Sequence, residues 1–132
     1  LMQKFLADVP KAYGTNGFVK TENGKKQIVI ERPFGAPGVN YIEGEYTLDF
    51  ILKALDEANV DKAVMKIPCC HEWMGLEMCR LFNDGMADFA DRSGGRLIPL
   101  AVVPPLGGDA AMAEFDRCVK ELGMKGIQLS AH

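Results

Sequence analysis

The sequence lacks the features that would tie it to a membrane, a nucleotide or a nucleic acid. No apolar run among its 132 residues approaches the roughly 18 to 20 residues that cross a bilayer, and its first residues lack the regions of a signal peptide. Phosphate-binding glycine loops and the GxSxG serine elbow are also absent. Its 15 basic and 18 acidic residues are spread along the chain, so no basic stripe can follow a phosphate backbone. We therefore predict a cytoplasmic protein with no nucleic-acid and no membrane partner.

Cysteine and histidine are scarce. The chain has four cysteines, of which Cys69 and Cys70 are adjacent and Cys79 and Cys118 lie among apolar residues, and it has two histidines. Secreted disulfide scaffolds are instead short and cysteine-dense. The cysteines are therefore expected to be reduced thiols.

The N-terminal third, residues 1–45, differs in composition from the rest. Residues 17–22 and 25–30 are strand-like and flank Asn23-Gly24, the dipeptide that best tolerates the positive φ angles of a type I′ turn. A β-hairpin is predicted here, followed by a Pro- and Gly-rich loop over residues 33–38. A short helix is also predicted near its start, at Phe5, Leu6 and Val9, and no other regular structure is predicted in this region.

Residues 46–132 alternate between helical and strand patterns. The apolar residues of the first helix recur at helical spacing, at Leu48, Ile51, Leu52 and Leu55. Thr47 can cap this helix, and Asn59 can end it in a left-handed conformation. Helices are also predicted over about 73–90 and after Asp109, which can act as an N-cap. Strands are predicted at 60–67, 97–103 and 126–130. This alternation favours an α/β fold with a parallel sheet.

Two places at the predicted strand ends carry candidate chemistry. Residues 68–72 (PCCHE) group metal-capable side chains, although neighbouring residues of an extended chain point to opposite sides and could supply one or two ligands at most. The alternatives are a loop that lines a pocket, or cysteines packed as small apolar residues with Glu72 at a helix N-terminus. His132 ends a parallel strand, where it could orient a carboxylate or relay a proton, or only hydrogen-bond a neighbouring loop.

Four stretches resemble the amidohydrolase-related decarboxylases. Residues 55–64 are similar to the family's MDxxGVDxxVL segment, with Asn59 in place of Gly, and residues 81–84 carry its Asn-Asp pair. Residues 96–104 resemble RFxGLAxxP. Residues 113–132 resemble AxxExxRCVxELGxxGVQIxxH, a signature of aminocarboxymuconate-semialdehyde decarboxylase and its relatives.

This resemblance implies a partial (β/α)8 TIM barrel, with about strands 2–4 and their helices in residues 46–132. Residues 1–45 would be a β-hairpin insertion after the first barrel strand. The family binds a divalent metal, zinc or manganese, through ligands that have no counterpart here, so the metal ligands are expected outside this chain. An eight-stranded barrel needs about 200 to 250 residues, and the chain is therefore expected to be part of a longer protein.

The resemblance also implies a set of pocket residues. His132 matches a pocket histidine of the family and is the predicted catalytic residue. Where the family has a carboxylate-binding arginine, this sequence has Gln27-Ile28, and the nearest arginine is Arg32. The predicted substrate-binding residues are Arg32, Cys69, Cys70, His71 and Trp73.

Three functions remain open at this stage. The first is a metal-dependent carboxy-lyase that decarboxylates a small aromatic or unsaturated carboxylate. The second is a metal-dependent hydrolase of a lactone, ester or amide on the same fold, since fold alone does not choose between them. The third is a stand-alone, non-catalytic α/β binding module with a flavodoxin-like sheet. The expected partner is a small carboxylate substrate, and a homodimer is a candidate assembly because dimers are common among the proteins it resembles.

Overall fold

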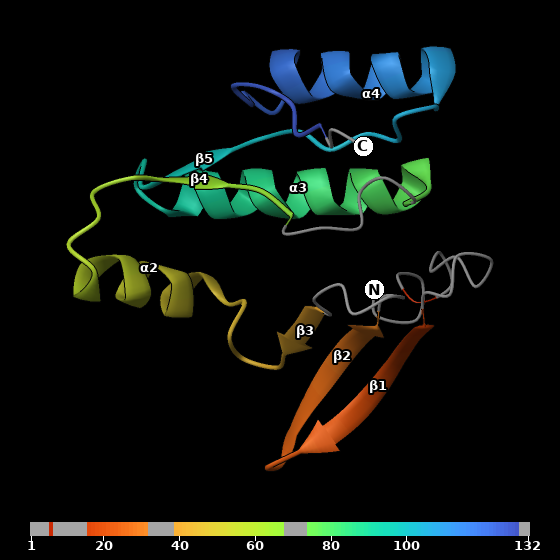
Figure 1. Ribbon diagram of the computed structural model, residues 1–132. Helices are drawn as coiled ribbons and strands as arrows, with labels where there is room; N and C mark the ends of the chain where they lie inside the picture. Colours follow the sequence, from red (N-terminus) through yellow and green to blue (C-terminus); the bar gives the residue numbers. More distant parts are fainter. Residues whose placement is uncertain (1–5, 7–15, 32–38, 68–73, 130–132) are drawn as a thin grey trace. The chain divides into compact units, whose positions relative to one another are not determined.

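The computed structural model describes residues 6, 16–31, 39–67 and 74–129 (Figure 1). The elements follow one another in this order: β1 (Asn16–Glu22), β2 (Lys25–Glu31), β3 (Val39–Ile42), α2 (Leu48–Glu57), β4 (Ala63–Met65), α3 (Leu76–Arg92), β5 (Leu97–Pro99) and α4 (Gly108–Lys120). The chain divides into two units, Leu1–Ile51 and Leu52–His132. The first carries an antiparallel sheet and the second carries parallel β/α units, so the fold is of the α/β class.

The predicted hairpin is present in the first unit. Strand β1 (Asn16–Glu22) pairs antiparallel with β2 (Lys25–Glu31), with Glu22 opposite Lys25. The two turn residues have positive φ angles, 52° at Asn23 and 74° at Gly24. Positive φ at both central positions is what a type I′ turn requires, and the Asn-Gly pair therefore sets the register of the hairpin.

A third strand, β3 (Val39–Ile42), was not predicted from the sequence. It pairs antiparallel with β2, with Gln27 opposite Ile42 and Ile30 opposite Val39. Its four residues follow a stretch rich in Pro and Gly and are too few to show a clear alternation. The hydrogen bonds that make it a strand come from the open edge of β2, which local sequence patterns do not reveal.

Helix α2 (Leu48–Glu57) begins and ends as its sequence predicts. The Thr47 hydroxyl oxygen accepts a hydrogen bond from the Phe50 amide at 3.3 Å, which is the expected N-cap. Asn59 has φ 51°, and the Val60 amide donates to the Leu55 carbonyl at 2.9 Å. This bond spans the left-handed residue as in a Schellman motif. The predicted left-handed stop is confirmed.

Arg96 holds the turn between α2 and β4. Its guanidinium donates to the carbonyls of Val60 and Asp61 at 2.9 and 2.6 Å and to the Asp56 carboxylate at 2.9 Å. Its own carbonyl accepts from the Ala63 amide, the first bond between the two parallel strands. The start of β4 is thereby fixed against the start of β5.

The sheet of the second unit is parallel, as predicted. Strand β4 (Ala63–Met65) pairs with β5 (Leu97–Pro99), and Ala101 forms a parallel bridge with Ile127. These pairings are shorter than the predicted strands at 60–67, 97–103 and 126–130. Beyond the ladder, side chains and not a neighbouring strand bind the backbone groups of Ile67 and Val102.

Helices α3 (Leu76–Arg92) and α4 (Gly108–Lys120) follow β4 and β5. The predicted N-cap role of Asp109 is wrong, because α4 begins at Gly108 and Asp109 lies in its first turn without a side-chain cap bond. Gly107 occupies the cap position instead. A Cβ atom there would lie 2.6 Å from the Ala111 Cβ, so the close approach of the loop to the first helical turn requires glycine.

The core of the second unit lies between the helices and one face of the sheet. The register places Leu97 and Ala101 on the same face, and both are buried. The buried methionines among the described residues are Met74, Met78, Met86 and Met124. Val64 points to the opposite face, where its side chain is 58% exposed. One face of this short sheet is therefore covered more completely than the other.

The left-handed position at Asn59 gives a first testable prediction. Asn59→Ala should lower the free energy of unfolding by about 1 kcal/mol, because alanine keeps the Cβ that strains this left-handed conformation and lacks the local hydrogen bonding by which asparagine tolerates it. Asn59→Gly should leave stability unchanged or raise it. Urea unfolding of both variants measures the difference, and equal stabilities would contradict the strain argument.

Candidate functional site

The residues predicted to form the pocket all lie outside the described residues: Arg32, Cys69, Cys70, His71, Trp73 and His132. Ile67 is the last described residue before Cys69, Cys70, His71 and Trp73, and Leu129 is the last one before His132. The described part of the candidate site lies at the carboxyl ends of the parallel strands, the edge where ligands bind in α/β folds.

At this edge the side-chain amide of Gln128 binds the backbone of Ile67. The Ile67 amide donates to Gln128 Oε1 at 3.0 Å, and Gln128 Nε2 donates to the Ile67 carbonyl at 2.7 Å. Ile67 is 3% exposed, so both of its backbone polar groups need partners. The end of β4 is thus joined to the strand segment that contains Gln128, 61 residues later in the chain.

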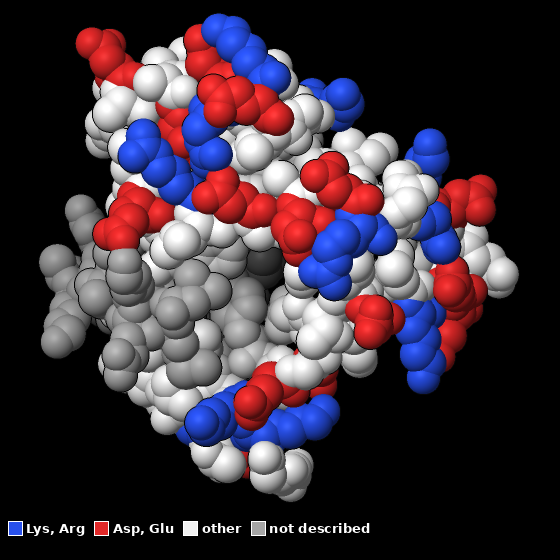
Figure 2. Space-filling view, turned by 180° about the vertical axis from the view of Figure 1, so that it is seen from behind, with Lys and Arg blue, Asp and Glu red and all other residues white. Residues whose placement is uncertain are grey.

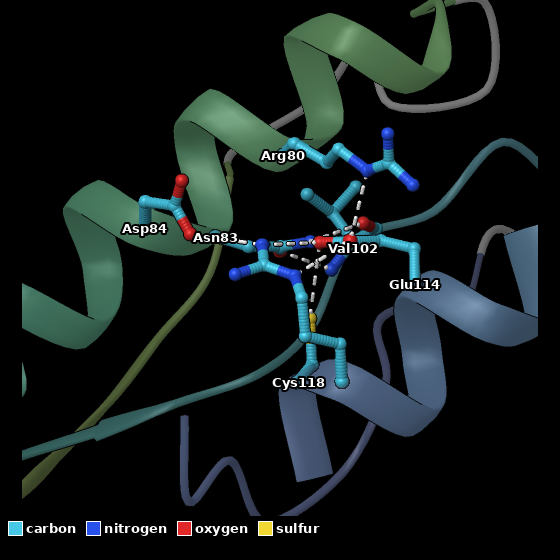
Figure 3. Close-up of polar contacts among 7 residues, drawn as sticks. Arg80, Asn83, Asp84, Val102, Glu114 and Cys118 are labelled. Carbon is cyan, nitrogen blue, oxygen red and sulfur yellow. Dashed lines mark hydrogen bonds and ion pairs between the residues drawn. The ribbon is translucent and has the colours of Figure 1, made fainter. Parts of the chain in front are cut away.

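A second side-chain amide, that of Asn83 on α3, binds Val102 in the same way. The Val102 amide donates to Asn83 Oδ1 at 2.9 Å, and Asn83 Nδ2 donates to the Val102 carbonyl at 2.9 Å (Figure 3). Asn83 and Val102 are both fully buried. The backbone just beyond β5 is thereby attached to the helix instead of to a neighbouring strand.

The amide of Asn83 is itself fixed by Glu114, whose side chain is 0% exposed. Asn83 Nδ2 also donates to Glu114 Oε1 at 2.9 Å. Arg80 on α3 and Arg117 on α4 donate to the carboxylate at 2.8 to 3.1 Å, and the Cys118 thiol donates to Oε1 at 3.5 Å. Figure 3 shows these side chains converging on Glu114 from both helices.

The surroundings of Glu114 keep it ionised. Burial opposes ionisation, but hydrogen bonds from Arg117, Asn83, Arg80 and Cys118 outweigh it and lower the pKa of the carboxyl to about 2. Arg117 also pairs with Asp84 at 2.8 Å. Hydrogen bonds to Glu114 and to Asp84 raise the pKa of the Arg117 guanidinium. The cluster is a charge-paired connection between α3 and α4.

Cys118 lies beside this carboxylate as a protonated thiol. Burial, followed by the negative charge of Glu114, raises the pKa of the thiol to about 12. Nucleophilic cysteines instead have a lowered pKa and some exposure. Cys118 and Cys79 are both buried and neither is in a disulfide, which agrees with the prediction of reduced thiols for these two cysteines.

Acidic and basic side chains are interspersed on the surface shown in Figure 2. Many of them form close pairs along one element, such as Arg92 with Asp88 and Lys53 with Glu57. Exposed pairs of this kind contribute little to stability, typically about 0 to 1 kcal/mol each. The opposite charges within each pair also cancel one another locally.

The described residues contain no group of three or more His, Cys, Asp or Glu side chains that could hold a metal ion. Glu114, the one fully buried carboxylate among them, is occupied by arginines and an amide. This part of the chain therefore offers no ligand set for a metal. Nor is any of its helices long and apolar enough to span a bilayer.

Sequence patterns missed the roles of Asn83, Glu114 and Gln128. A signal was present for Glu114, because it falls between the buried Ala111 and Cys118 at helical spacing and so interrupts an apolar face with a charge. A charged residue in such a position must be paired. No comparable local signal exists for Gln128, whose partner is distant in the sequence.

The parallel β/α units and their helix-covered sheet define an α/β protein of the kind that binds ligands at its strand ends. A sequence model of the amidohydrolase family matches residues 47–132. The chain therefore belongs to the amidohydrolase family. The match includes all the residues of the Glu114 cluster and the Gln128 bridge.

A solved structure agrees with this assignment. A protein from Staphylococcus aureus, provisionally described as an amidohydrolase, superposes with a TM-score of 0.57 at 25% sequence identity. The alignment covers 64% of this chain and 29% of that protein. The chain thus corresponds to less than a third of its length.

Substitution of Glu114 tests the buried cluster. Glu114→Gln should lower the free energy of unfolding at pH 7 by about 3 kcal/mol, because the arginines lose their carboxylate while the site stays buried. The wild type should lose a similar amount in acid. The lowered pKa makes this stability complete above about pH 4.5 and loses it as the pH falls through about 2.

Urea unfolding between pH 2 and 7 measures both effects. Asp116→Asn on the same helix is the matched control, because Asp116 is 59% exposed and pairs with Lys120 one turn away. It should change stability by less than about 0.5 kcal/mol. A Glu114→Gln variant as stable as this control would show that the cluster contributes nothing.

The raised pKa of Cys118 predicts resistance to alkylation. Iodoacetamide at pH 8 should leave Cys118 unmodified in the folded protein, since the thiol is buried and protonated, and should modify it after unfolding in urea. Peptide mass spectrometry distinguishes Cys118 from the other three cysteines. Rapid labelling of Cys118 in the folded state would contradict the geometry.

Proposed function

We propose that this chain is part of a metal-dependent decarboxylase that acts on a small aromatic or unsaturated carboxylate, in the aminocarboxymuconate-semialdehyde decarboxylase-like branch of the amidohydrolases. The main observation is the family match over residues 47–132, whose last twenty residues carry the signature that resembles this branch. Residues 1–45 would be the hairpin insertion, and residues 46–132 about strands 2–4 of a (β/α)8 barrel.

The described sheet supports a place within a larger barrel. Its strands are parallel and each is followed or preceded by a helix, as in (β/α)8 folds. The side chain of Val64 is 58% exposed on the less covered face. An apolar strand residue of this kind would become buried if further strands closed the sheet around it.

In this proposal the substrate binds at the carboxyl ends of the strands. His132 orients the substrate and can hold or release a proton near neutral pH. Arg32 pairs with the substrate carboxylate, for which its planar fork is suited. The other proposed contacts follow Ile67 in the sequence: Cys69, Cys70, His71 and Trp73.

The metal of the whole enzyme is assigned to residues beyond this chain. The family is typically metal-dependent, but the described residues bring no three ligand-type side chains together. No described residue is therefore assigned a role as a metal ligand. This chain would contribute substrate contacts and part of the wall of the pocket.

A second candidate is hydrolysis of a lactone, ester or amide. It is favoured by the family assignment itself, since the matching family and the similar solved protein are both described as amidohydrolases. The same residues would then position a carbonyl group instead of a carboxylate. Whether the protein has a partner subunit, such as a second copy of itself, stays a prediction.

Turnover by the full-length protein that contains this chain tests these proposals. With zinc or manganese added, we expect release of carbon dioxide from aromatic or unsaturated carboxylates and no hydrolysis of lactones or esters. Hydrolysis without carbon dioxide release would reverse the choice. Headspace measurement of carbon dioxide and spectrophotometry of the carboxylate report the reaction.

A matched pair of variants tests the role of His132. His132→Gln should lower kcat/KM by about 100-fold or more, because glutamine cannot take up or release a proton beside the substrate. Lys120→Ala should leave kcat/KM unchanged, since its side chain is 70% exposed on α4. Full activity of His132→Gln would remove His132 from the proposed site.

A further inference from the structure

The backbone ladder between β4 and β5 stops one step before their strand-like sequences end. Its last bond runs from the Leu100 amide to the Met65 carbonyl at 3.0 Å. The alternation of a parallel ladder would next join the Ile67 amide to the Leu100 carbonyl, and then the Val102 amide to the Ile67 carbonyl. Among the described residues neither bond is formed.

Two side-chain amides take the place of these missing bonds. Gln128 binds both backbone groups of Ile67, and Asn83 binds both backbone groups of Val102. Each amide presents an oxygen to the N–H and an NH2 to the carbonyl, as a neighbouring strand would. The two strands can therefore part at their carboxyl ends without leaving these buried groups unsatisfied.

Gln128 makes this connection from a strand that is itself held to the sheet. The Ala101 amide donates to the Gly126 carbonyl, and the Gln128 amide donates to the Ala101 carbonyl, both at 2.9 Å. Gln128 therefore binds the extension of β5 with its main chain and the end of β4 with its side chain. One residue fixes three neighbouring segments at this edge.

We propose that Gln128 is a positioning residue of the active site, which fixes the end of β4 at Ile67 against the extension of β5 at Ala101. This inference rests on the proposed function, because that function places the substrate at the carboxyl ends of these strands. Gln128 acts through Ile67 and is not itself proposed to touch the substrate.

Two substitutions in the full-length protein separate this role from simple stability. Gln128→Leu removes both hydrogen bonds at similar size. It should lower kcat/KM by about 100-fold, because displaced substrate contacts reduce the rate even when the fold survives. It should also reduce the protection of the Ile67 amide from hydrogen exchange by about 10-fold.

Gln128→Glu gives a pH-dependent readout that a merely structural residue would not produce. A protonated carboxyl group can accept from the Ile67 amide and donate to its carbonyl, as glutamine does, whereas the ionised form cannot donate. Relative to wild type at each pH, kcat/KM and Ile67 protection should recover in acid and fall as the new carboxyl ionises. The Gln128→Leu variant should show no such recovery.

The outcomes distinguish the inference from the proposed function. Loss of Ile67 protection with unchanged kcat/KM, or unchanged protection in Gln128→Leu, would overturn the positioning role. If wild-type protein shows neither decarboxylation nor hydrolysis, the proposed function fails. In that case an acid-dependent recovery of Ile67 protection in Gln128→Glu would still support the pairing, and its absence would refute it.

Discussion

A single buried carboxylate determines how the second unit of this protein packs. The side chain of Glu114 is fully buried, and an unpaired charge there would be very costly, so its oxygens need hydrogen-bond donors. Its donors come from α3, through Arg80 and Asn83, and from α4, through Arg117 and Cys118. These bonds therefore connect the two helices and oppose a change in their relative position.

The same constraint reaches the candidate site through Asn83. Because Glu114 accepts from one hydrogen of the Asn83 amide, the other groups of that amide face Val102, and the backbone beyond β5 is bound to the helix. A continued ladder would satisfy that backbone without ordering any side chain. Here the side chains of Asn83 and Gln128 bind these backbone groups instead, and both side chains must be ordered for this.

The sequence predicted the parts of the fold that depend on neighbouring residues. The hairpin follows from the φ angles that Asn23-Gly24 permits, and the ends of α2 follow from Thr47 and Asn59. Strand β3 and the interactions of Glu114 and Gln128 depend on partners up to 61 residues away, which periodicity does not reveal. The predicted pocket residues lie outside the described residues, and the structure describes the chain up to Ile67 and Leu129, which precede most of them in the sequence.

The strongly shifted pKa of Glu114 does not make it a catalytic candidate. Shifted values often mark active sites, because catalytic acids and bases need a pKa near the working pH and access to substrate. Glu114 has neither, since its pKa is about 2 and five hydrogen bonds occupy its two oxygens. A carboxylate saturated by its own protein has no capacity left for a reacting group. Its contribution to function is to hold Asn83, and through Asn83 the end of β5, in place.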